Sequence, residues 1–409
     1  MSELNRREFL GAGAAGLTTL STLKRARASA SPSPSLADED PLGVRGDFPV
    51  TQSGTTYLNT AAFSPIPKSV EQAGRLYLED KMLGRSRNSE QREEARRRFC
   101  ELFGVKEREV AFLYSTTDGE NIVASSLDFR PGDNVVVDEL HFTSTFVLYR
   151  QLEKLHGIEL RVVPHVDGRA RLSDFDARID ARTKLVSIAW VSNRNGFRQD
   201  LRALADLTHD KGSLLYADAI QALGCFPVSL GESGVDFATS GCYKWLLGTP
   251  GLSIFYVREE HLDRIQPDRF GHGQVLRELP GLTFEMKTTA EKYEYANPAG
   301  GPMHHLNAGL GYLSRVGLSR IEEHTASLGA ELRDAIAKLG FTPFTPANHR
   351  TPIVSFEHGR DPEEFSGRLR KENVIVTLRE GGRLLRASIA LFNNRDDIAR
   401  LVGVIETFA

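Results

Sequence analysis

Lys244 is the residue of this sequence whose surroundings most strongly suggest covalent chemistry. It lies between Tyr243 and Trp245, and a turn rich in glycine and proline, Gly248–Gly251, follows it. An amine among aromatic side chains loses hydration. This disfavours its ammonium form, lowers its pKa and makes it a nucleophile toward a carbonyl group. The alternative is a lysine whose aliphatic stem packs at the edge of a core while its ammonium group reaches water.

Asp218 and Gln221 follow an apolar run, residues 213–217, that predicts a buried strand. A carboxylate at the end of such a strand is costly unless it meets a cation. Asp218 also precedes a short helix-like run, Ala219–Ala222, so the alternative is that it caps a helix.

Two hydroxyl residues, Thr116 and Thr117, stand between a predicted strand at 109–114 and a predicted helix that runs to Leu127. The free N–H groups and the dipole of a helix face such a turn, which is typical of a phosphate site. Ordinary capping of the helix by either threonine explains the same residues.

Further side chains follow two other predicted strands. His141 and Phe142 come after the strand at 134–137, and Asn193 ends the strand at 184–191. Ligands of open α/β sheets bind at the carboxyl ends of the strands. These side chains are therefore candidates for the same site.

Together these groups match the needs of one cofactor, pyridoxal 5'-phosphate: an acid for its pyridine nitrogen, a lysine for its aldehyde and a helix terminus for its phosphate. With these residues the sequence resembles the fold-type I enzymes, specifically the class V aminotransferase superfamily. That superfamily includes cysteine desulfurases, kynureninase and isopenicillin N epimerase. The resemblance covers nearly all of residues 57–409. It is carried by Tyr57–Ala62, Ser115–Asn121, Val191–Asn193, Asp218–Gln221, Tyr243–Trp245 with Gly248–Gly251, and Arg386–Asn393.

The resemblance implies a role for each residue around the cofactor ring. Lys244 would bind the cofactor covalently, and Asp218 would pair with the pyridinium nitrogen. Gln221 and Asn193 would contact the ring hydroxyl. Phe142 occupies the ring-stacking position, where desulfurases have histidine, and a shift of one residue in the alignment would put His141 there instead.

The resemblance also implies how the phosphate and the substrate are held. Thr116, Thr117 and Tyr243 would bind the phosphate. Asn297 would reach the phosphate of a second subunit, which implies a homodimer. Arg386 would bind the substrate's α-carboxylate through two parallel hydrogen bonds.

Two departures separate the sequence from the desulfurases. Gly241 stands where they have a phosphate-binding serine. The segment before Arg386, residues 377–385, lacks the nucleophilic cysteine that desulfurases carry there. Sulfur transfer through a protein persulfide is therefore not expected. Arg379 and Arg383 in that segment are rivals of Arg386 for the substrate carboxylate.

The order of predicted elements indicates the fold class. Strands and helices alternate up to about residue 290, which predicts an α/β protein with a mainly parallel sheet and helices on both faces. Beyond that point a long helical stretch and short strands predict a smaller α+β domain. The resemblance implies the fold-type I pyridoxal-phosphate-dependent transferase fold with a seven-stranded sheet. We expect a large cofactor-binding domain at 57–290 and a small C-terminal domain at 291–409.

The composition excludes several classes of protein. The 409 residues are 40% hydrophobic and 26% charged, with a net charge of −3, which is typical of a globular protein without a nucleic-acid-binding surface. The three cysteines, Cys100, Cys225 and Cys242, are too few and too scattered for a disulfide framework or a cysteine-rich zinc site. No metal is expected.

The first 28 residues predict a twin-arginine signal peptide. Arg6 and Arg7 precede a mild apolar run at 10–23, and Ala26–Ala28 supplies an A-x-A cleavage motif. The run is too short and too rich in glycine and alanine for a permanent membrane span. We expect contact with the twin-arginine translocation machinery, a periplasmic location, and a linker and N-terminal arm at 29–56. The alternative is a disordered basic tail. The combination of such a signal with this fold resembles the periplasmic pyridoxal-phosphate enzyme that tailors pyoverdine siderophores.

We therefore expect an exported enzyme that acts on the amino group or Cα of an amino acid or amino-acyl metabolite, by transamination, epimerisation or deamination. The alternatives are a kynureninase-like or C–S lyase β-elimination and, more remotely, a non-catalytic binding protein of the same fold. Loss of the lysine or the aspartate would favour the binding protein, and both residues are present.

Overall fold

The computed structural model describes residues 39–409, so the predicted signal peptide at 1–28 lies outside the described part of the chain. Among the described residues, no helix combines the length and the apolar character needed to cross a membrane.

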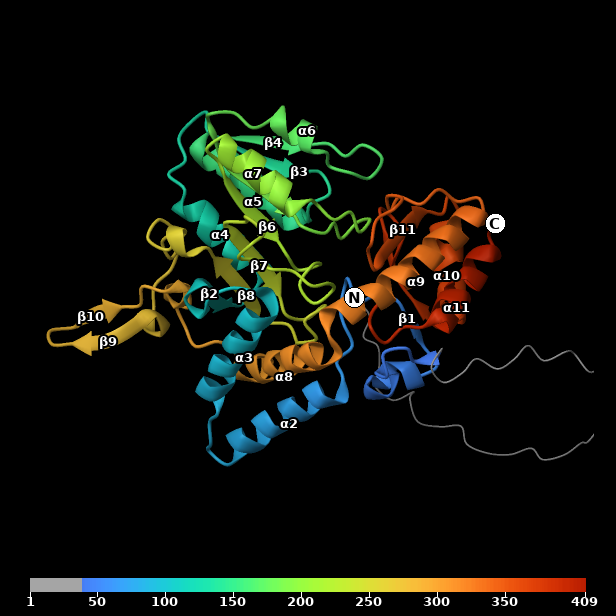
Figure 1. Cartoon of the computed structure of the whole chain (residues 1–409), viewed down its shortest axis with the longest axis horizontal. Coiled ribbons are helices and arrows are strands. Elements are labelled where there is room, and N and C mark those ends of the chain that lie inside the picture. The colour runs from blue at the N-terminus through green and yellow to red at the C-terminus, as the bar shows by residue number, and fades with distance from the viewer. Residues whose placement is uncertain (1–38) are drawn as a thin grey trace, which may run out of the picture. The chain divides into compact units, whose positions relative to one another are not determined.

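A seven-stranded sheet forms the centre of the larger domain (Figure 1). The strand order is β2-β8-β7-β6-β5-β3-β4, and β8 alone runs antiparallel to its neighbours. The strands are β2 (Val110–Leu113), β3 (Asn134–Asp138), β4 (Glu159–Val163), β5 (Thr183–Ala189), β6 (Leu214–Asp218), β7 (Phe237–Gly241) and β8 (Ser253–Val257). The predicted α/β class with a mainly parallel sheet is confirmed.

Two hydrophobic clusters cover the two faces of this sheet. Val136 and Leu215 belong to the cluster that contains side chains of α3, α7 and α8, whereas their neighbours Val135 and Leu214 belong to the cluster of α4 and α5. Successive strand residues point to opposite faces, so the helices form layers on either side of the sheet. The helices are α3 (Asn88–Phe103), α4 (Thr116–Ser126), α5 (Thr143–His156), α6 (Leu172–Asp176), α7 (Leu201–Asp210) and α8 (Gly300–Val316).

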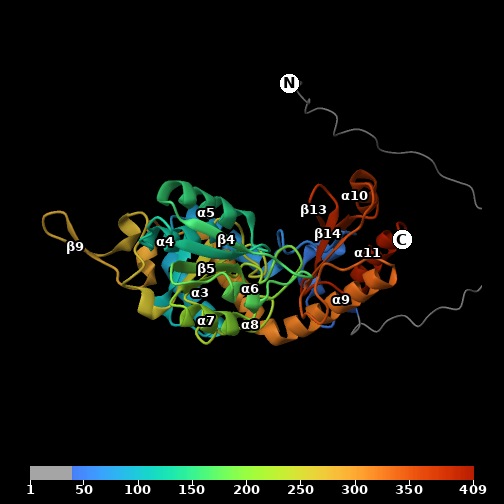
Figure 2. The same cartoon turned by 90° about the horizontal axis from the view of Figure 1, so that it is seen from above.

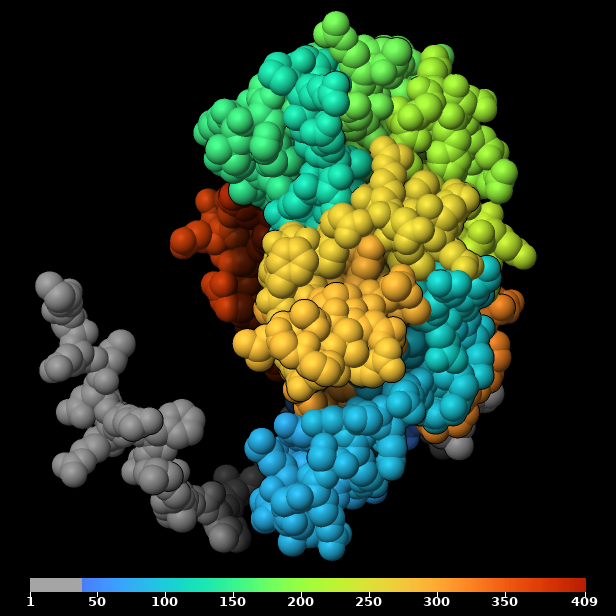
Figure 3. All heavy atoms as spheres, turned by 90° about the vertical axis from the view of Figure 1, so that its left-hand side faces the viewer, coloured from blue at the N-terminus to red at the C-terminus, as the bar shows by residue number. Residues whose placement is uncertain are grey.

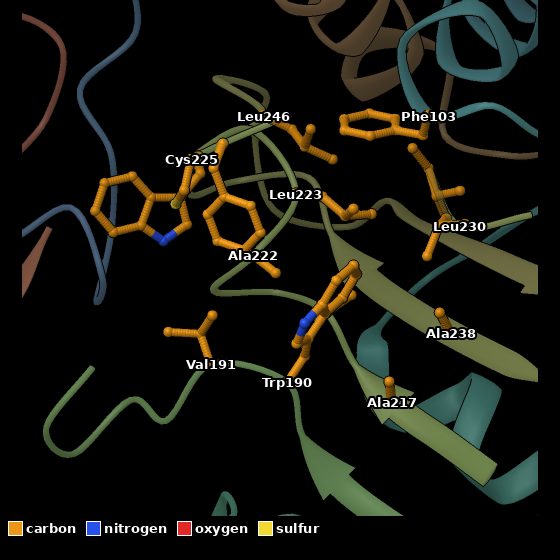
Figure 4. Packing of buried hydrophobic residues seen from close by; sticks show 14 of the residues in the cluster. Phe103, Trp190, Val191, Ala217, Ala222, Leu223, Cys225, Leu230, Ala238 and Leu246 are labelled. Carbon is orange, nitrogen blue, oxygen red and sulfur yellow. The ribbon is translucent and has the colours of Figure 1, made fainter. Parts of the chain in front are cut away.

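The first cluster extends from the sheet to the loops that carry the candidate site. Figure 4 shows Trp190 and Leu223 of these loops packed near Phe103 of α3. Trp190 also meets the ring of Phe226 edge-on, with 6.0 Å between the ring centroids. The loops at the carboxyl ends of β5 and β6 thus rest on a packed core.

Helix α8 packs against α3 and α2 (Lys68–Met82), and its apolar side chains join the core of the larger domain. The helix that follows, α9 (Leu318–Lys338), begins in that core and ends in the core of the smaller domain. In the structure the large-domain packing therefore continues through residue 321.

The smaller domain is built on an antiparallel sheet in the order β11-β14-β13, with α9, α10 and α11 packed in its core (Figures 1 and 2). Its strands and helices are β11 (Ile353–Glu357), β12 (Val374–Ile375), β13 (Thr377–Arg379), β14 (Leu384–Ser388), α10 (Pro362–Lys371) and α11 (Arg395–Glu406). The early strand β1 (Thr56–Tyr57) pairs in parallel with β12, and Leu58 is buried in this core. The first described strand is thus part of the C-terminal domain.

A hairpin of β9 (Val275–Leu279) and β10 (Thr283–Met286) projects from the larger domain. Figure 3 looks at the side from which it projects, where its gold atoms occupy the centre of the surface. Leu282 at its tip is 89% exposed.

Candidate active site

A cavity of about 350 Å³ lies at the edge of the sheet where the parallel strands end. The predicted residues that line it are Thr116, Thr117, Phe142, Asn193, Asp218, Gln221, Tyr243 and Lys244. They come from the segments that follow β2, β3, β5, β6 and β7, as expected for a ligand site in an open α/β sheet.

Lys244 and Asp218 are the charged side chains in the cavity wall. Lys244 is 7% exposed, and burial lowers the pKa of its amine to about 8, against the opposing charge of Asp218. Burial raises the pKa of the Asp218 carboxyl to about 6, opposed by the hydrogen bond from Ile220 and by the charge of Lys244. At neutral pH the structure thus holds a carboxylate beside an amine that loses its proton readily.

Asp218 does not begin a helix. Its Oδ1 accepts the backbone N–H of Ile220 at 3.0 Å, but residues 220–225 form consecutive turns. Asp218 therefore makes one hydrogen bond of the kind a helix cap makes, but there is no helix for it to cap. Helix capping does not explain why its carboxyl group is buried at the cavity.

Helix α4 is capped by Ser115. The Ser115 hydroxyl accepts the N–H of Asp118 at 3.2 Å, and Asp118 accepts the Ser115 N–H in return. Capping by either threonine is thus not observed. The backbone N–H groups of Thr116 and Thr117 have no acceptor within the part of the chain that the structure describes, so they remain available to an anion.

Ser115 was the site residue that the sequence reasoning missed. Its signal was present, because serine followed three residues later by an acidic residue is a capping-box pattern. Tyr114, just before Ser115, also lines the cavity.

Gly241 is required by the close approach of β7 to α4. Its N–H donates to the Thr116 hydroxyl at 3.0 Å. A Cβ at this position would lie 2.9 Å from Ile220 and 3.2 Å from the Thr116 hydroxyl. A serine here would require the end of the Ile220 side chain to shift, so the tight packing favours glycine at this position.

The structure distinguishes Phe142 from its neighbour His141. Phe142 lines the cavity and is 45% exposed, whereas His141 is 4% exposed and is not part of the wall. The His141 Nε2 lies 3.4 Å from the hydroxyls of Thr145 and Ser187, and burial lowers its pKa to about 3. Phe142 is thus the ring available for stacking.

The two residues expected at the ring hydroxyl differ in whether their side-chain oxygens already have hydrogen-bond partners. The Gln221 amide donates to the carbonyl of Ala61 at 2.9 Å and accepts from the indole N–H of Trp245 at 2.7 Å. The Asn193 Oδ1 is buried and has no hydrogen-bond partner among the described residues. Since such an atom is costly to leave unpaired, Asn193 is the better placed acceptor for a ring hydroxyl.

Arg386 lies beside the cavity, not in its lining. It is 2% exposed and donates to the carbonyl of Asn193 at 2.9 Å and to the Thr377 hydroxyl at 2.8 Å. Its Nε is buried without a partner among the described residues. Burial, followed by the charge of Arg379, lowers its pKa to about 10.

Asn297 lies apart from this cavity. It is exposed, its carbonyl accepts the Tyr114 hydroxyl at 3.2 Å, and it borders a second, polar cavity. The predicted contact with a second subunit's phosphate stays a prediction.

The cavity fits pyridoxal phosphate on three independent observations. A buried lysine whose amine has a lowered pKa lines the cavity, and so does a buried carboxylate, Asp218. The free N–H groups at the start of α4 also lie in its wall. Lys244 would bind the aldehyde, Asp218 the ring nitrogen, and Thr116 and Thr117 the phosphate. Such a site belongs to the pyridoxal-phosphate-dependent enzymes.

Comparison with known proteins defines the family. The profile of the class-V aminotransferases matches residues 56–401. An uncharacterized aminotransferase of Bacillus subtilis, YcbU, is 28% identical over 372 residues, covering 89% of this chain and 97% of that protein. A probable cysteine desulfurase of Methanothermobacter thermautotrophicus is 27% identical, covering 90% and 97%.

The solved structures agree with this result. The apo cysteine desulfurase of Thermococcus onnurineus superposes with a TM-score of 0.82 at 25% identity, covering 90% of this chain and 98% of that one. A C-DES variant with glycine covalently linked to its PLP cofactor gives the same score at 17% identity, which supports the fold. The chain belongs to the class-V aminotransferase family, and its cofactor is pyridoxal phosphate.

Proposed function

We propose that this chain is an exported enzyme that acts on the amino group or Cα of an amino acid or amino-acyl metabolite, by transamination, epimerisation or deamination. The observation that carries the proposal is the buried pair Lys244 and Asp218 at the cavity. The complete set of groups argues against a non-catalytic binding protein.

Each residue has a defined task in such a reaction. Bound pyridoxal phosphate supplies an electron sink for negative charge at Cα. Asp218, as a carboxylate, holds a proton at the ring nitrogen. The Lys244 amine, with its lowered pKa, takes a proton from Cα and returns it. Arg386 orients the substrate through its carboxylate.

A C–S lyase β-elimination or a kynureninase-like cleavage is the second candidate. The first is considered because relatives are named cysteine desulfurases, whose reaction also breaks a C–S bond. Transfer through a protein persulfide is not part of this proposal, because Cys100, Cys225 and Cys242 are all buried and burial raises the pKa of each thiol. The residues between β13 and β14 contain no cysteine.

Product analysis distinguishes these reactions. The purified protein is reconstituted with pyridoxal phosphate and incubated with a panel of amino acids, with and without a keto acid. Transamination makes a new amino acid from the keto acid, epimerisation changes only chirality, and deamination releases ammonia. β-Elimination releases pyruvate and ammonia together with the sulfur group, as sulfide from cysteine or as cysteine persulfide from cystine, so pyruvate and not ammonia identifies it. An inert holoenzyme on free and peptide-linked amino acids would contradict the enzyme proposal.

Export and assembly form separate parts of the proposal. The full-length chain is expected in the periplasm of a bacterium with the twin-arginine pathway, and replacing both Arg6 and Arg7 with lysine should retain it in the cytoplasm. Equal periplasmic recovery of both forms would contradict export by this route. The proposed homodimer should have twice the mass of the chain in solution. A monomeric holoenzyme with full activity would contradict this part of the proposal.

A further inference from the structure

Arg379 and Arg386 lie on one face of the small-domain sheet. Thr377 of β13 pairs directly with Arg386 of β14, and Arg379 pairs with Leu384. Residues opposite one another in an antiparallel pair share a face, and so do residues two apart on one strand. The two arginines are therefore diagonal neighbours, a separation of about 7–8 Å between backbones that long side chains span easily.

This face adjoins the cavity at Arg386. Arg386 donates to the carbonyl of Asn193, which lines the cavity. The charges of Arg386 and Arg379 both lower the pKa of the Lys244 amine. The strand register and the Arg386 hydrogen bond thus place Arg379 on the sheet face that adjoins the cavity, one diagonal position from Arg386.

Among residues 39–409, no carboxylate forms a hydrogen bond or ion pair with Arg379, although the charge of Glu380 acts on it. The structure gives it no hydrogen bond or ion pair with any residue of the described range 39–409, although its side chain is partly buried. The nearby Glu380 is paired with Arg194. Burial and the charge of Arg194 lower the pKa of Arg379, against the opposing charge of Glu380.

The cavity wall cannot supply the missing anion either. Asp218 is its one carboxylate, and that group is assigned to the ring nitrogen. The α-carboxylate of an ordinary amino acid presents two oxygens, which one guanidinium fork satisfies. Arg386, with its unpaired Nε, is the group available for it. A second guanidinium is then left over.

We propose that the natural substrate carries a second anionic group, in the simplest case a side-chain carboxylate, and that Arg379 binds it while Arg386 binds the α-carboxylate. This inference rests on the proposed function, because it assigns the substrate class of the same site. It makes Arg379 a residue that determines specificity.

Binding of unreactive dicarboxylates tests the inference without turnover. Glutarate and succinate are titrated into the holoenzyme by calorimetry, beside their monoamides, which keep the shape and lose one charge. The variants are Arg379→Gln, Arg379→Lys and, as a control, Arg383→Gln. Arg383 is exposed and donates to the carbonyl of Glu380, so its variant removes one positive charge from the same loop.

At least one dicarboxylate is expected to bind the wild type about 10-fold to 100-fold more tightly than its monoamide. Arg379→Gln should remove this ratio, Arg379→Lys should restore part of it, and Arg383→Gln should keep it. An unchanged ratio in Arg379→Gln, or no ratio in the wild type, overturns the inference. Equal weakening of both probes in Arg379→Gln also overturns it, because Arg379 would then serve the α-carboxylate. Failure of the proposed function is distinguishable, since it would show as a holoenzyme that is inert in the product analysis, whereas these binding ratios are measured without turnover.

Discussion

Arg386 of β14 donates a hydrogen bond to the backbone carbonyl of Asn193, 2.9 Å away, and so joins the small domain to the loop that follows β5 of the large domain. The same loop places the free Oδ1 of Asn193 at the cofactor cavity. The residue proposed to bind the substrate thus contacts the residue proposed to bind the cofactor's ring hydroxyl.

Replacing Arg386 should weaken substrate binding and spare the cofactor. Arg386→Ala removes one partner of a desolvated charge pair, a loss of about 2–5 kcal/mol, and Arg386→Lys should recover little because lysine lacks the planar fork. The dissociation constant of a substrate amino acid and the visible absorbance of the bound cofactor measure the two effects. Equal rates for free and amidated amino acids, unchanged in Arg386→Ala, would remove the clamp role.

Phe142 should support the cofactor ring, and His141 should not touch it. Phe142→Ala is expected to weaken cofactor affinity by about 1 kcal/mol or more, in the range of aromatic stacking, whereas Phe142→His keeps a flat ring and should retain most of it. Cofactor dissociation constants measured by fluorescence provide the comparison. Loss of affinity in His141→Gln with none in Phe142→Ala would reverse the assignment.

Asp218→Asn should reduce turnover far more than stability. The amide still presents an oxygen to the Ile220 N–H, but it cannot hold a proton at the ring nitrogen, and contributions of this kind are about 100-fold to 10,000-fold. The measurement is kcat beside the melting temperature of the apoprotein. Normal kcat in a variant that melts early would mean that Asp218 serves the fold alone.

The sequence predicted the parallel sheet well because buried strands such as Asn134–Asp138 and Leu214–Asp218 carry continuous apolar runs. It did not predict the hairpin of β9 and β10, whose residues are mostly exposed and lack the alternation that marks a half-buried strand. Nor could it show that Leu58 packs in the C-terminal domain, because the pairing of β1 with β12 joins residues far apart in the chain.

In the candidate site, too, the sequence predicted positions along the chain but not the contacts between distant segments. Positions at strand ends were predicted because a sheet brings its carboxyl ends together. The partners of Gln221 were not, since Ala61 and Trp245 reach it through the fold. The choice between His141 and Phe142 likewise depended on which ring the α5 cap turns toward the cavity.

A buried carboxylate away from the site should make stability depend on pH. Burial alone would raise the pKa of Asp236, but hydrogen bonds from His209, His261 and the N–H of Leu215 outweigh it and lower the pKa from 3.8 to about 2. The hydrogen bond to Asp236 raises the pKa of His209 above 6.5. The Asp236 contribution, ~2 kcal/mol at one pKa unit per 1.36 kcal/mol, is present above pH 4 and is lost toward pH 2. The His209 contribution is complete below pH 6.5 and is lost as the pH rises through its folded pKa.

The apoprotein should therefore exceed Asp236→Asn in melting temperature most clearly near pH 5, with a smaller difference above neutral pH. Asp206→Asn, on the exposed surface of α7, is the matched control and should show little difference. A difference between wild type and Asp236→Asn that stays constant from pH 3 to pH 9 would contradict the assignment.

The most direct test of the account is to locate the covalently bound cofactor. Wild-type protein loaded with pyridoxal phosphate is reduced with borohydride, digested and sequenced by mass spectrometry, beside Lys244→Ala and Lys292→Ala. Lys292 is a second buried lysine, but it hydrogen-bonds the carbonyl of Leu262 away from the cavity. We expect the cofactor mass on Lys244 in the wild type and in Lys292→Ala, and neither cofactor nor turnover in Lys244→Ala. Cofactor on another lysine, or full turnover in Lys244→Ala, would contradict it.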